Sequence, residues 1–231
     1  GAGKTYHICH NIDPTKRNLI LAFTHENINN IQKELCAAHG CVPELTTVAT
    51  FDSFVYHHFV LPYEPSIAQH FGAPGFISHG ICTVDPPPMR IPVRGGRMVP
   101  NPHYFKKDNL AHYITKRNQY YCATLSELVL QVKHNRESLV KRVATRLNLF
   151  FDCILIDEFQ DFREYDYELI LTLANQLQDV VLVGDYHQHS VSATNNSGKP
   201  FKKRTDDVSY DEFIAELKNA GFKVDLTTLD K

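Results

Sequence analysis

The residues with the clearest chemical use stand at the start of the chain, where Gly1, Ala2, Gly3, Lys4 and Thr5 follow one another ("GAGKT"). In a phosphate-binding loop, glycines let backbone N–H groups surround the phosphates, the lysine reaches the β- and γ-phosphate oxygens, and the hydroxyl ligates Mg²⁺. Only the second half of that pattern is present. A Gly-Lys-Thr run in an exposed turn explains the same residues equally well.

Two acidic residues, Asp157 and Glu158, directly follow the apolar run "CILI". Hydrolysis of a magnesium-bound triphosphate needs one carboxylate near the metal and another that orients and deprotonates the attacking water. Adjacent acids at the carboxyl end of a strand can do both, because an open α/β sheet binds its ligand at that edge. The alternative is an exposed helix N-terminus, where acidic residues are also favoured.

A second apolar run, "VVLV", ends in the same way, with a turn at Gly184 followed by Asp185 and Gln188. A glutamine in that place can hydrogen-bond a γ-phosphate and respond to its loss. Alone, the pattern also describes an ordinary exit from a strand into a loop. The three segments together favour a site for ATP and Mg²⁺, because their polar residues are complementary.

The elements around these residues alternate between strands and helices. Short apolar runs predict strands at residues 18–24, 45–51, 153–157, 180–185 and 223–229. The spacing of apolar residues predicts helices at residues 6–12, 26–40, 52–60, 163–177 and 210–221, and Asp52 or Ser53 should cap the third of them. Strands separated by helices of this length favour an α/β fold with a parallel sheet covered on both faces.

The middle of the chain interrupts this alternation. Residues 62–102 are rich in Pro and Gly, so we expect irregular structure there. Residues 103–146 carry a net charge of +6, and residues 125–147 have a helical pattern. Lys and Arg displace counterions from phosphates, and tyrosines can stack on bases. The tyrosines concerned are Tyr104, Tyr113, Tyr120 and Tyr121. A solvated helical face with tyrosines in the core explains the segment equally well.

In chain order, the segments "GAGKT", "LAFTHENI", "TVATFDSF", "LIDEFQD" and "LVGDYHQ" resemble the motifs of the UvrD/Rep-like superfamily 1 DNA helicases. In that family they are the Walker A loop, two DNA-contacting motifs, the Walker B box and the VGD-x-x-Q motif. The resemblance implies a P-loop NTPase with a RecA-like parallel sheet and helices on both faces. It implies that residues 1–61 and 148–231 form this domain, interrupted by a partly irregular, partly helical insertion or accessory subdomain at residues 62–147.

The resemblance also implies roles for individual residues. Phosphate binding falls to Gly1, Ala2, Gly3, Lys4 and Thr5, and Mg²⁺ ligation to Thr5 and Asp157. Glu158 is the implied general base, acting with Asp157, Lys4 and Gln188, while Gln160 sits beside the nucleotide and Gln188 couples the γ-phosphate to the DNA path. The single-stranded DNA track is implied to run over Phe23, Thr24, Thr50, Phe51 and Ser53. Asp52 stands where family members often have His, and "HSV" follows Gln188 in place of the usual "SIY".

The resemblance implies that the whole protein is an ATP-dependent helicase that translocates on single-stranded DNA, meets a junction between single and double strands, and serves DNA repair. Such helicases bind ATP between two RecA-like domains, and the second domain supplies arginines that stabilise the transferring phosphoryl group. We expect this chain to be an internal piece, truncated at both ends, that lacks the second domain. Such a piece should bind nucleotide weakly and hydrolyse it negligibly.

Two other functions remain open. One is a P-loop ATPase that uses ATP as a switch, in defence or repair, without unwinding DNA. The other is a non-enzymatic nucleic-acid-binding remnant of a helicase, in which the +6 segment dominates the binding.

The composition is that of an ordinary soluble globular protein, with 43% hydrophobic and 22% charged residues in 231. The net charge of −2 does not exclude nucleic-acid binding, because basic residues can cluster. No apolar run approaches the roughly 20 residues that cross a bilayer, and no signal-peptide pattern is present, so we expect a cytoplasmic protein without membrane contact. The six cysteines form no Cys-x-x-Cys pair, and we expect reduced, mostly buried thiols rather than zinc ligands.

Overall fold

The computed structural model describes residues 3–162, 164–188 and 209–227, and the chain divides into two compact units. Unit 1 consists of residues 1–54 and 140–231, and unit 2 of residues 55–139. Unit 2 is therefore inserted between the two parts of unit 1 in the sequence. It contains most of the segment expected to form an insertion, residues 62–147.

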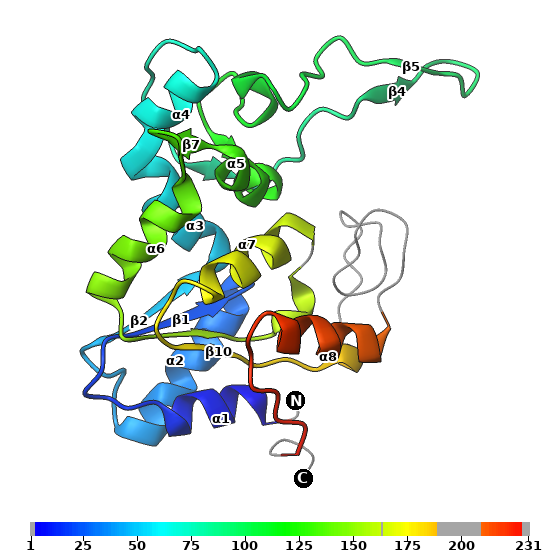
Figure 1. The fold of residues 1–231 in the computed structure, drawn as a ribbon. Helices are drawn as coiled ribbons and strands as arrows, with labels where there is room; N and C mark the ends of the chain where they lie inside the picture. The colour runs from blue at the N-terminus through cyan, green and yellow to red at the C-terminus, as the bar shows by residue number, and fades with distance from the viewer. Residues whose placement is uncertain (1–2, 163, 189–208, 228–231) are drawn as a thin grey trace. The chain divides into compact units, whose positions relative to one another are not determined.

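Unit 1 is built on a four-stranded parallel sheet (Figure 1). Its strands are β1 (Asn18–Ala22), β2 (Thr46–Thr50), β9 (Cys153–Ile156) and β10 (Val180–Leu182), in the order β10-β9-β1-β2. All three pairs of neighbouring strands are parallel. Every residue of β1 and β9 is buried, as in a sheet with both faces covered. The predicted α/β fold with a RecA-like parallel sheet is confirmed.

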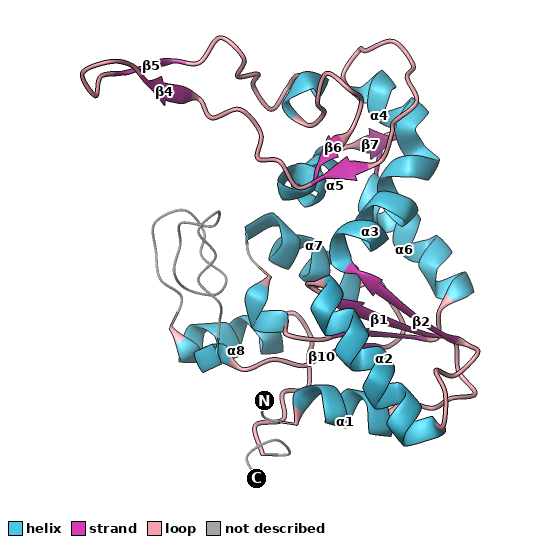
Figure 2. Ribbon diagram, turned by 180° about the vertical axis from the view of Figure 1, so that it is seen from behind, coloured by secondary structure: helices cyan, strands magenta, loops and turns pink. Residues whose placement is uncertain are grey.

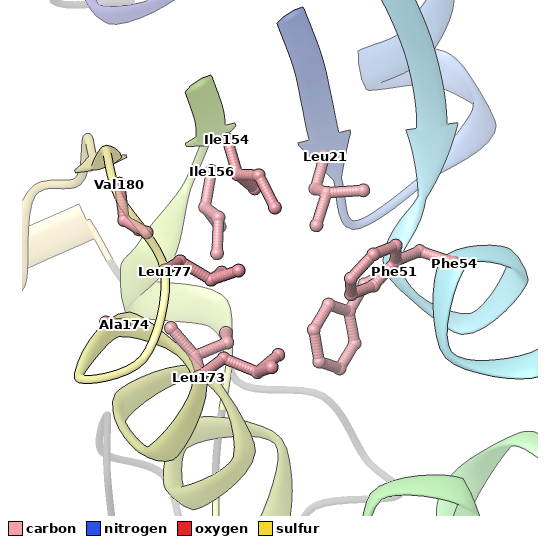
Figure 3. A pocket seen from close by; sticks show the side chains of 10 residues that line it. Leu21, Phe51, Phe54, Ile154, Ile156, Leu173, Ala174, Leu177 and Val180 are labelled. Carbon is pink, nitrogen blue, oxygen red and sulfur yellow. The ribbon is translucent and has the colours of Figure 1, made fainter. Parts of the chain in front are cut away.

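Alternate residues of β1 point to opposite faces of the sheet. On one face, Ile20 and Ala22 pack in a core cluster with apolar residues of α1 (Lys4–Asn11) and α2 (His25–His39). On the other face, Leu21 borders a small apolar cavity of about 10 Å³, enclosed partly by α7 (Glu164–Ala174) and α3 (Phe51–Val55) (Figure 3). Helices therefore cover both faces, as the sequence predicts.

The helix predicted at residues 52–60 differs in its start and in its form. It begins at Phe51, and Thr50 Oγ1 accepts a hydrogen bond from the backbone N–H of Ser53 at 3.2 Å. The expected caps, Asp52 and Ser53, are therefore wrong. After α3 the chain continues through a π-helical turn, η1 (Tyr56–Val60), and a 3₁₀ turn, η2 (Leu61–Tyr63).

The long helix predicted at residues 125–147 is in fact two helices with a hairpin between them. These are α5 (Leu125–Gln131), the strands β7 (Lys133–His134) and β8 (Glu137–Ser138), and α6 (Leu139–Phe150). Asn135 and Arg136 have φ angles of 51° and 68°. Two successive residues with positive φ make a tight hairpin turn, a place that favours Asn, and a right-handed helix cannot pass through them.

Residues 62–102 are more ordered than their composition predicts. They contain α4 (Glu64–His70), which has Pro65 in its first turn, and β3 (Ile81–Cys82), which pairs in parallel with β6 (Tyr120–Tyr121). The strands β4 (Arg90–Pro92) and β5 (Met98–Pro100) form an antiparallel arm that projects from unit 2 (Figure 2). The 3₁₀ turns η3 (Leu110–His112) and η4 (Cys122–Thr124) complete this unit's regular structure in the described residues.

The tyrosines of the basic segment belong mainly to the core of unit 2. Tyr113 and Tyr120 are 0% exposed and Tyr121 is 7% exposed, whereas Tyr104 is half-buried. A base cannot stack on a ring that is covered on both sides. For Tyr113, Tyr120 and Tyr121 the core interpretation is therefore the correct one.

The C-terminal part of unit 1 contains α8 (Tyr210–Asn219), which begins with a capping box between Ser209 and Glu212. The strand predicted at residues 223–229 is not formed over its described part, residues 223–227, which are irregular. Residues 228 and 229 lie outside the described residues. None of the described helices is both long and apolar enough to be a candidate membrane span.

The six cysteines are all free, but they are not mostly buried. Only Cys9 and Cys153 are buried, and burial raises the pKa of both thiols to about 12. Cys36 and Cys41 are exposed, because they lie on the outer side and just beyond the end of α2.

Candidate nucleotide site

The three polar segments predicted to form a site meet at one edge of the sheet in unit 1. Lys4 begins α1, Asp157 and Glu158 follow β9, and Gln188 ends the 3₁₀ turn η6 (Tyr186–Gln188) that follows β10. The carboxyl ends of parallel strands lie along one edge, so residues far apart in sequence meet there.

Lys4 is the centre of this arrangement. Its Nζ lies 2.9 Å from Glu158 Oε2 and 3.2 Å from Gln188 Oε1, and the residue is 4% exposed. A buried ammonium needs a paired charge and hydrogen-bond acceptors, and these two residues supply them. The lysine therefore holds the acid that follows β9 and the glutamine that follows β10 close together.

Thr5 and Asp157 form a second contact beside it. Thr5 Oγ1 donates a hydrogen bond to Asp157 Oδ2 at 2.9 Å, and the backbone N–H of Glu158 donates to Asp157 Oδ1 at 3.0 Å. Burial raises the pKa of Asp157, which is 1% exposed, while the hydrogen bond from Thr5 acts in the opposite direction. A carboxylate and a hydroxyl oxygen side by side suit Mg²⁺, which binds one or two protein carboxylates and takes its remaining ligands from water and phosphates.

Glu158 has an unusual backbone conformation. Its φ and ψ angles are 52° and 45°, in the left-handed region that costs a non-glycine residue free energy. The next residue, Phe159, starts the 3₁₀ turn η5 (Phe159–Asp161), and its backbone N–H donates to the carbonyl of Val183 at 2.9 Å. The strained residue thus turns its carboxylate toward Lys4 while the chain stays attached to the loop after β10.

Gln160 links the loop after β9 to the loop after β10. It is 2% exposed, its Nε2 donates to Glu158 Oε2, and its Oε1 accepts from the backbone N–H of Asp185 at 2.9 Å. A Cβ atom added to Gly184 would lie only 2.8 Å from Gln160 Oε1, so Gln160 would have to shift to admit any other residue at position 184. The motif pattern placed Gln160 beside the site but gave no sign of these two bonds.

The start of α1 provides backbone donors. Gly3 has a φ of 67°, precedes Lys4, and provides no side-chain cap for the helix. The first N–H groups of a helix have no partner within the helix, and they are a common site for phosphate. Gly1 and Ala2, also expected to bind phosphate, lie outside the described residues.

The residues expected to line a DNA track fall into two groups. Phe23 is 39% exposed, and Thr24, also exposed, caps α2 by accepting the backbone N–H of Asn27 at 3.1 Å. Thr50 and Ser53 are half-buried, and Thr50 caps α3. Phe51 is 3% exposed, and its ring packs edge-on against Phe162 at a centroid distance of 4.8 Å, so it offers no face to a base.

A groove that the sequence did not predict borders Lys4. It has a volume of about 730 Å³, within the range of pockets for small molecules, and it lies between β10 and α8. His7, Asp185 and Tyr186 contribute polar groups, and Phe213 and Leu217 of α8 contribute apolar surface. The groove could not be predicted because α8 comes late in the chain and no local pattern links it to β10.

Comparison with known families agrees with this arrangement. The family model of the UvrD/REP helicase N-terminal domain matches residues 101–190, a stretch that includes the acids after β9 and the loop after β10. No curated protein matches the sequence. The family match, the parallel sheet and the convergence of Lys4, Glu158 and Gln188 together support a UvrD/Rep-like helicase N-terminal domain in this chain.

Proposed function

We propose that unit 1 is the ATP-binding motor domain of a superfamily 1 DNA helicase, which couples ATP hydrolysis to translocation on single-stranded DNA and to duplex unwinding. The observation that carries the proposal is the position of Lys4 Nζ, 2.9 Å from Glu158 and 3.2 Å from Gln188. A lysine from the phosphate-binding loop thereby contacts both the acid and the glutamine whose chemistry depends on a γ-phosphate.

The proposed roles follow from these contacts. Lys4 gives up part of its pairing with Glu158 and Gln188 to bind the β- and γ-phosphate oxygens, which compensate its charge in their place. Thr5 and Asp157 hold Mg²⁺, which, when bound, neutralises charge on the phosphates. Glu158, released from Lys4, accepts the proton of the attacking water. Gln188 then hydrogen-bonds the γ-phosphate and loses that partner when the phosphate leaves.

The proposed contact with single-stranded DNA lies at Phe23 and Thr24, which are the exposed members of the expected track. An exposed aromatic ring can stack on a base, at a benefit of about 1–3 kcal/mol for each base. Thr50 and Ser53 lie beside them in the proposal as polar contacts to the backbone of the strand.

The first test is nucleotide binding, measured as thermal stabilisation of the chain by Mg²⁺ and a non-hydrolysable ATP analogue. A ligand at about 100 times its Kd should stabilise the fold by about 2.7 kcal/mol. Lys4→Ala should abolish this stabilisation, and Lys33→Ala, which removes an exposed lysine of α2, should leave it unchanged. Full stabilisation of the Lys4→Ala variant would refute the site.

The second test separates the helicase from the other two functions. In the full-length protein, single-stranded DNA should stimulate ATP hydrolysis, ATP should drive strand displacement, and Glu158→Gln should abolish both while retaining nucleotide binding. DNA-stimulated hydrolysis without strand displacement would identify an ATPase switch. DNA binding that ignores ATP and weakens steeply with salt would identify a non-enzymatic nucleic-acid-binding remnant.

A further inference from the structure

Aromatic rings connect the proposed DNA contact of unit 1 with the loop that carries Gln188. Phe23 meets Phe162 edge-on at a centroid distance of 5.7 Å, and Phe162 meets Phe159 at 6.5 Å. Phe159 meets Phe213 at 6.2 Å, and Phe213 stacks with Tyr186 at 5.7 Å. We call these five residues the ring row. Centroid distances of 4.5–7 Å are those of attractive aromatic pairs.

The two ends of the ring row lie at the two proposed binding sites. Phe23 directly follows β1 and is 39% exposed, so its ring is accessible to a nucleic-acid base. Tyr186 is the first residue of η6, and Gln188, which contacts Lys4, is the last. A movement at one end therefore affects Phe23, the proposed DNA contact, and a movement at the other affects the turn that carries Gln188, the proposed γ-phosphate contact.

The middle of the ring row is buried and passes through the acidic segment. Phe159 is 2% exposed and Phe162 is 0% exposed, and Phe159 stands between Glu158 and Gln160 in the chain. Close-packed interiors transmit small displacements, because neighbouring rings have no free volume into which they can relax. The ring row is thus packed against the backbone that positions Glu158.

Phe213 is the link that only tertiary structure provides. It comes from α8, is 7% exposed, and joins Phe159 to Tyr186. A hydrogen bond also holds α8 against α7: Tyr167 Oη donates to Glu216 Oε2 at 2.8 Å. Further along the same loop, His187 stacks on Tyr210 of α8 at 5.7 Å. The loop that ends in Gln188 is therefore held by α8 through adjacent residues.

We propose that Phe213 is a positioning residue that couples the DNA contact at Phe23 to the nucleotide contact at Gln188. The proposal rests on the proposed function, because it needs both ligands to bind unit 1. Coupling of this kind is reciprocal: single-stranded DNA changes the affinity for nucleotide by the same factor as nucleotide changes the affinity for DNA. Phe213 acts through its ring contacts with Phe159 and Tyr186.

The test measures the Kd of a fluorescent ATP analogue with Mg²⁺, in the absence and presence of saturating oligo-dT. The ratio of the two values is the coupling factor, which in allosteric proteins is about 5–150. Phe213→Leu keeps an apolar side chain but removes the ring, and it should bring the ratio to about 1 while the Kd of the nucleotide alone changes by less than about twofold. A substitution that only destabilised the fold would change the Kd of the nucleotide alone as well, and would not reduce the coupling factor by itself.

The matched control is Phe222→Leu. Phe222 borders the same groove and follows α8, but it is not part of the ring row, so the coupling factor should stay at the wild-type value. If Phe213→Leu fails to fold, Tyr186→Leu breaks the ring row at its other end and should give the same loss of coupling.

The outcomes separate this proposal from the proposed function. The coupling role of Phe213 would be overturned if a folded Phe213→Leu or Tyr186→Leu variant kept the wild-type coupling factor. It would also be overturned if the wild-type protein bound both ligands with a coupling factor of 1. Neither result would affect the proposed nucleotide site. Failure of the wild-type chain to bind the analogue at all would overturn the nucleotide site, and the coupling with it.

Discussion

Units 1 and 2 use their polar and aromatic residues in opposite ways. In unit 1, polar side chains from distant segments meet at the edge of a parallel sheet, and Lys4 contacts Glu158 and Gln188 there. In unit 2, Tyr113, Tyr120 and Tyr121 are buried, whereas the basic residues of the arm are exposed. Residues 86–107 contain five Lys or Arg and no Asp or Glu, and Arg90, Arg94 and Arg97 of the arm are exposed.

The difference shows which physical effect dominates in each unit. A site that handles a triphosphate needs donors and acceptors fixed within hydrogen-bond distance, and a parallel sheet with short βα connections supplies that precision. A surface that attracts nucleic acid needs only accessible positive charge, because phosphate contacts are independent of sequence and tolerate irregular backbone. Pro- and Gly-rich segments such as those of unit 2 are compatible with a surface of that kind, whereas they would disrupt the site in unit 1.

The largest effect should come from an aromatic residue in the core of unit 2. Tyr120→Ala should lower the free energy of unfolding by about 3–5 kcal/mol, because it empties a fully buried position. Tyr120→Phe should change the stability little, because the Tyr120 hydroxyl is buried without a hydrogen-bond partner in the described structure. Urea unfolding, with hydrogen exchange to localise the effect in unit 2, measures both. A stable Tyr120→Ala variant with weakened DNA binding would restore the base-stacking interpretation.

A smaller effect should follow in unit 1 from Gly184→Ala. The added Cβ would lie 2.8 Å from Gln160 Oε1 and 3.2 Å from its backbone nitrogen, so Gln160 must move away from Glu158 and Asp185. We expect a loss of about 1–3 kcal/mol of stability, together with weaker nucleotide binding in the thermal-shift assay.

Gly75→Ala in unit 2 is the matched control for Gly184, because a Cβ atom there meets nothing within 4 Å and the backbone has no positive φ. It should leave both stability and nucleotide binding unchanged. Equal effects of the two glycine substitutions would contradict the close approach at Gly184.

A still smaller loss of stability, with a defined pH dependence, should come from substituting Glu127 of unit 2. Glu127 pairs with Lys107, and its carboxylate, 3.8 Å from His112 Nε2, raises the pKa of that imidazole above 6.5. Because the pKa is raised in the folded state, this stabilisation is complete below the unfolded pKa of about 6.5 and is lost as the pH rises through the folded value.

Glu127→Gln should therefore lower the stability by about 1 kcal/mol in mildly acidic solution and by less in alkaline solution. It should also lower the pKa of His112 in an NMR titration. An unchanged imidazole pKa would show that Glu127 is not its partner. Both residues hold the base of the arm, since His112 Nδ1 lies 2.7 Å from the carbonyl oxygen of Phe105.

The smallest effect should come from the ion pair between Arg17 and Asp152, which joins the starts of β1 and β9 in unit 1. Arg17 lowers the pKa of Asp152 from 3.8 to about 2. The stabilisation is therefore present above about pH 4 and is lost as the pH falls toward 2. Asp152→Asn should reduce stability slightly at neutral pH, and the reduction should shrink as the pH falls toward 2, as measured by urea unfolding across this range. A constant difference at every pH would exclude the ion pair as the cause.

Much of unit 1 could be predicted from the sequence, because each of its strands is indicated by a short run of neighbouring apolar residues. Each apolar run that became β1, β2, β9 or β10 is recognisable from its own residues, and the polar residues after two of the runs, β9 and β10, indicate the edge at which the site forms. Unit 2 could be predicted less well. The apolar spacing of residues 125–147 continues across a hairpin, and only the positive φ angles of Asn135 and Arg136 separate the two helices.

The sequence by itself determined which chemical groups this protein has, in which order, and at the ends of which strands. Tertiary structure alone decided that Gln160 braces Glu158 and Asp185, that Phe51, Tyr113 and Tyr120 are buried, and that Phe213 joins Phe159 to Tyr186. The reason is that the apolar spacing of a strand or helix can be recognised from neighbouring residues, whereas burial and hydrogen-bond partners depend on elements distant in the chain. Those elements come together only when the sheet has formed in its register.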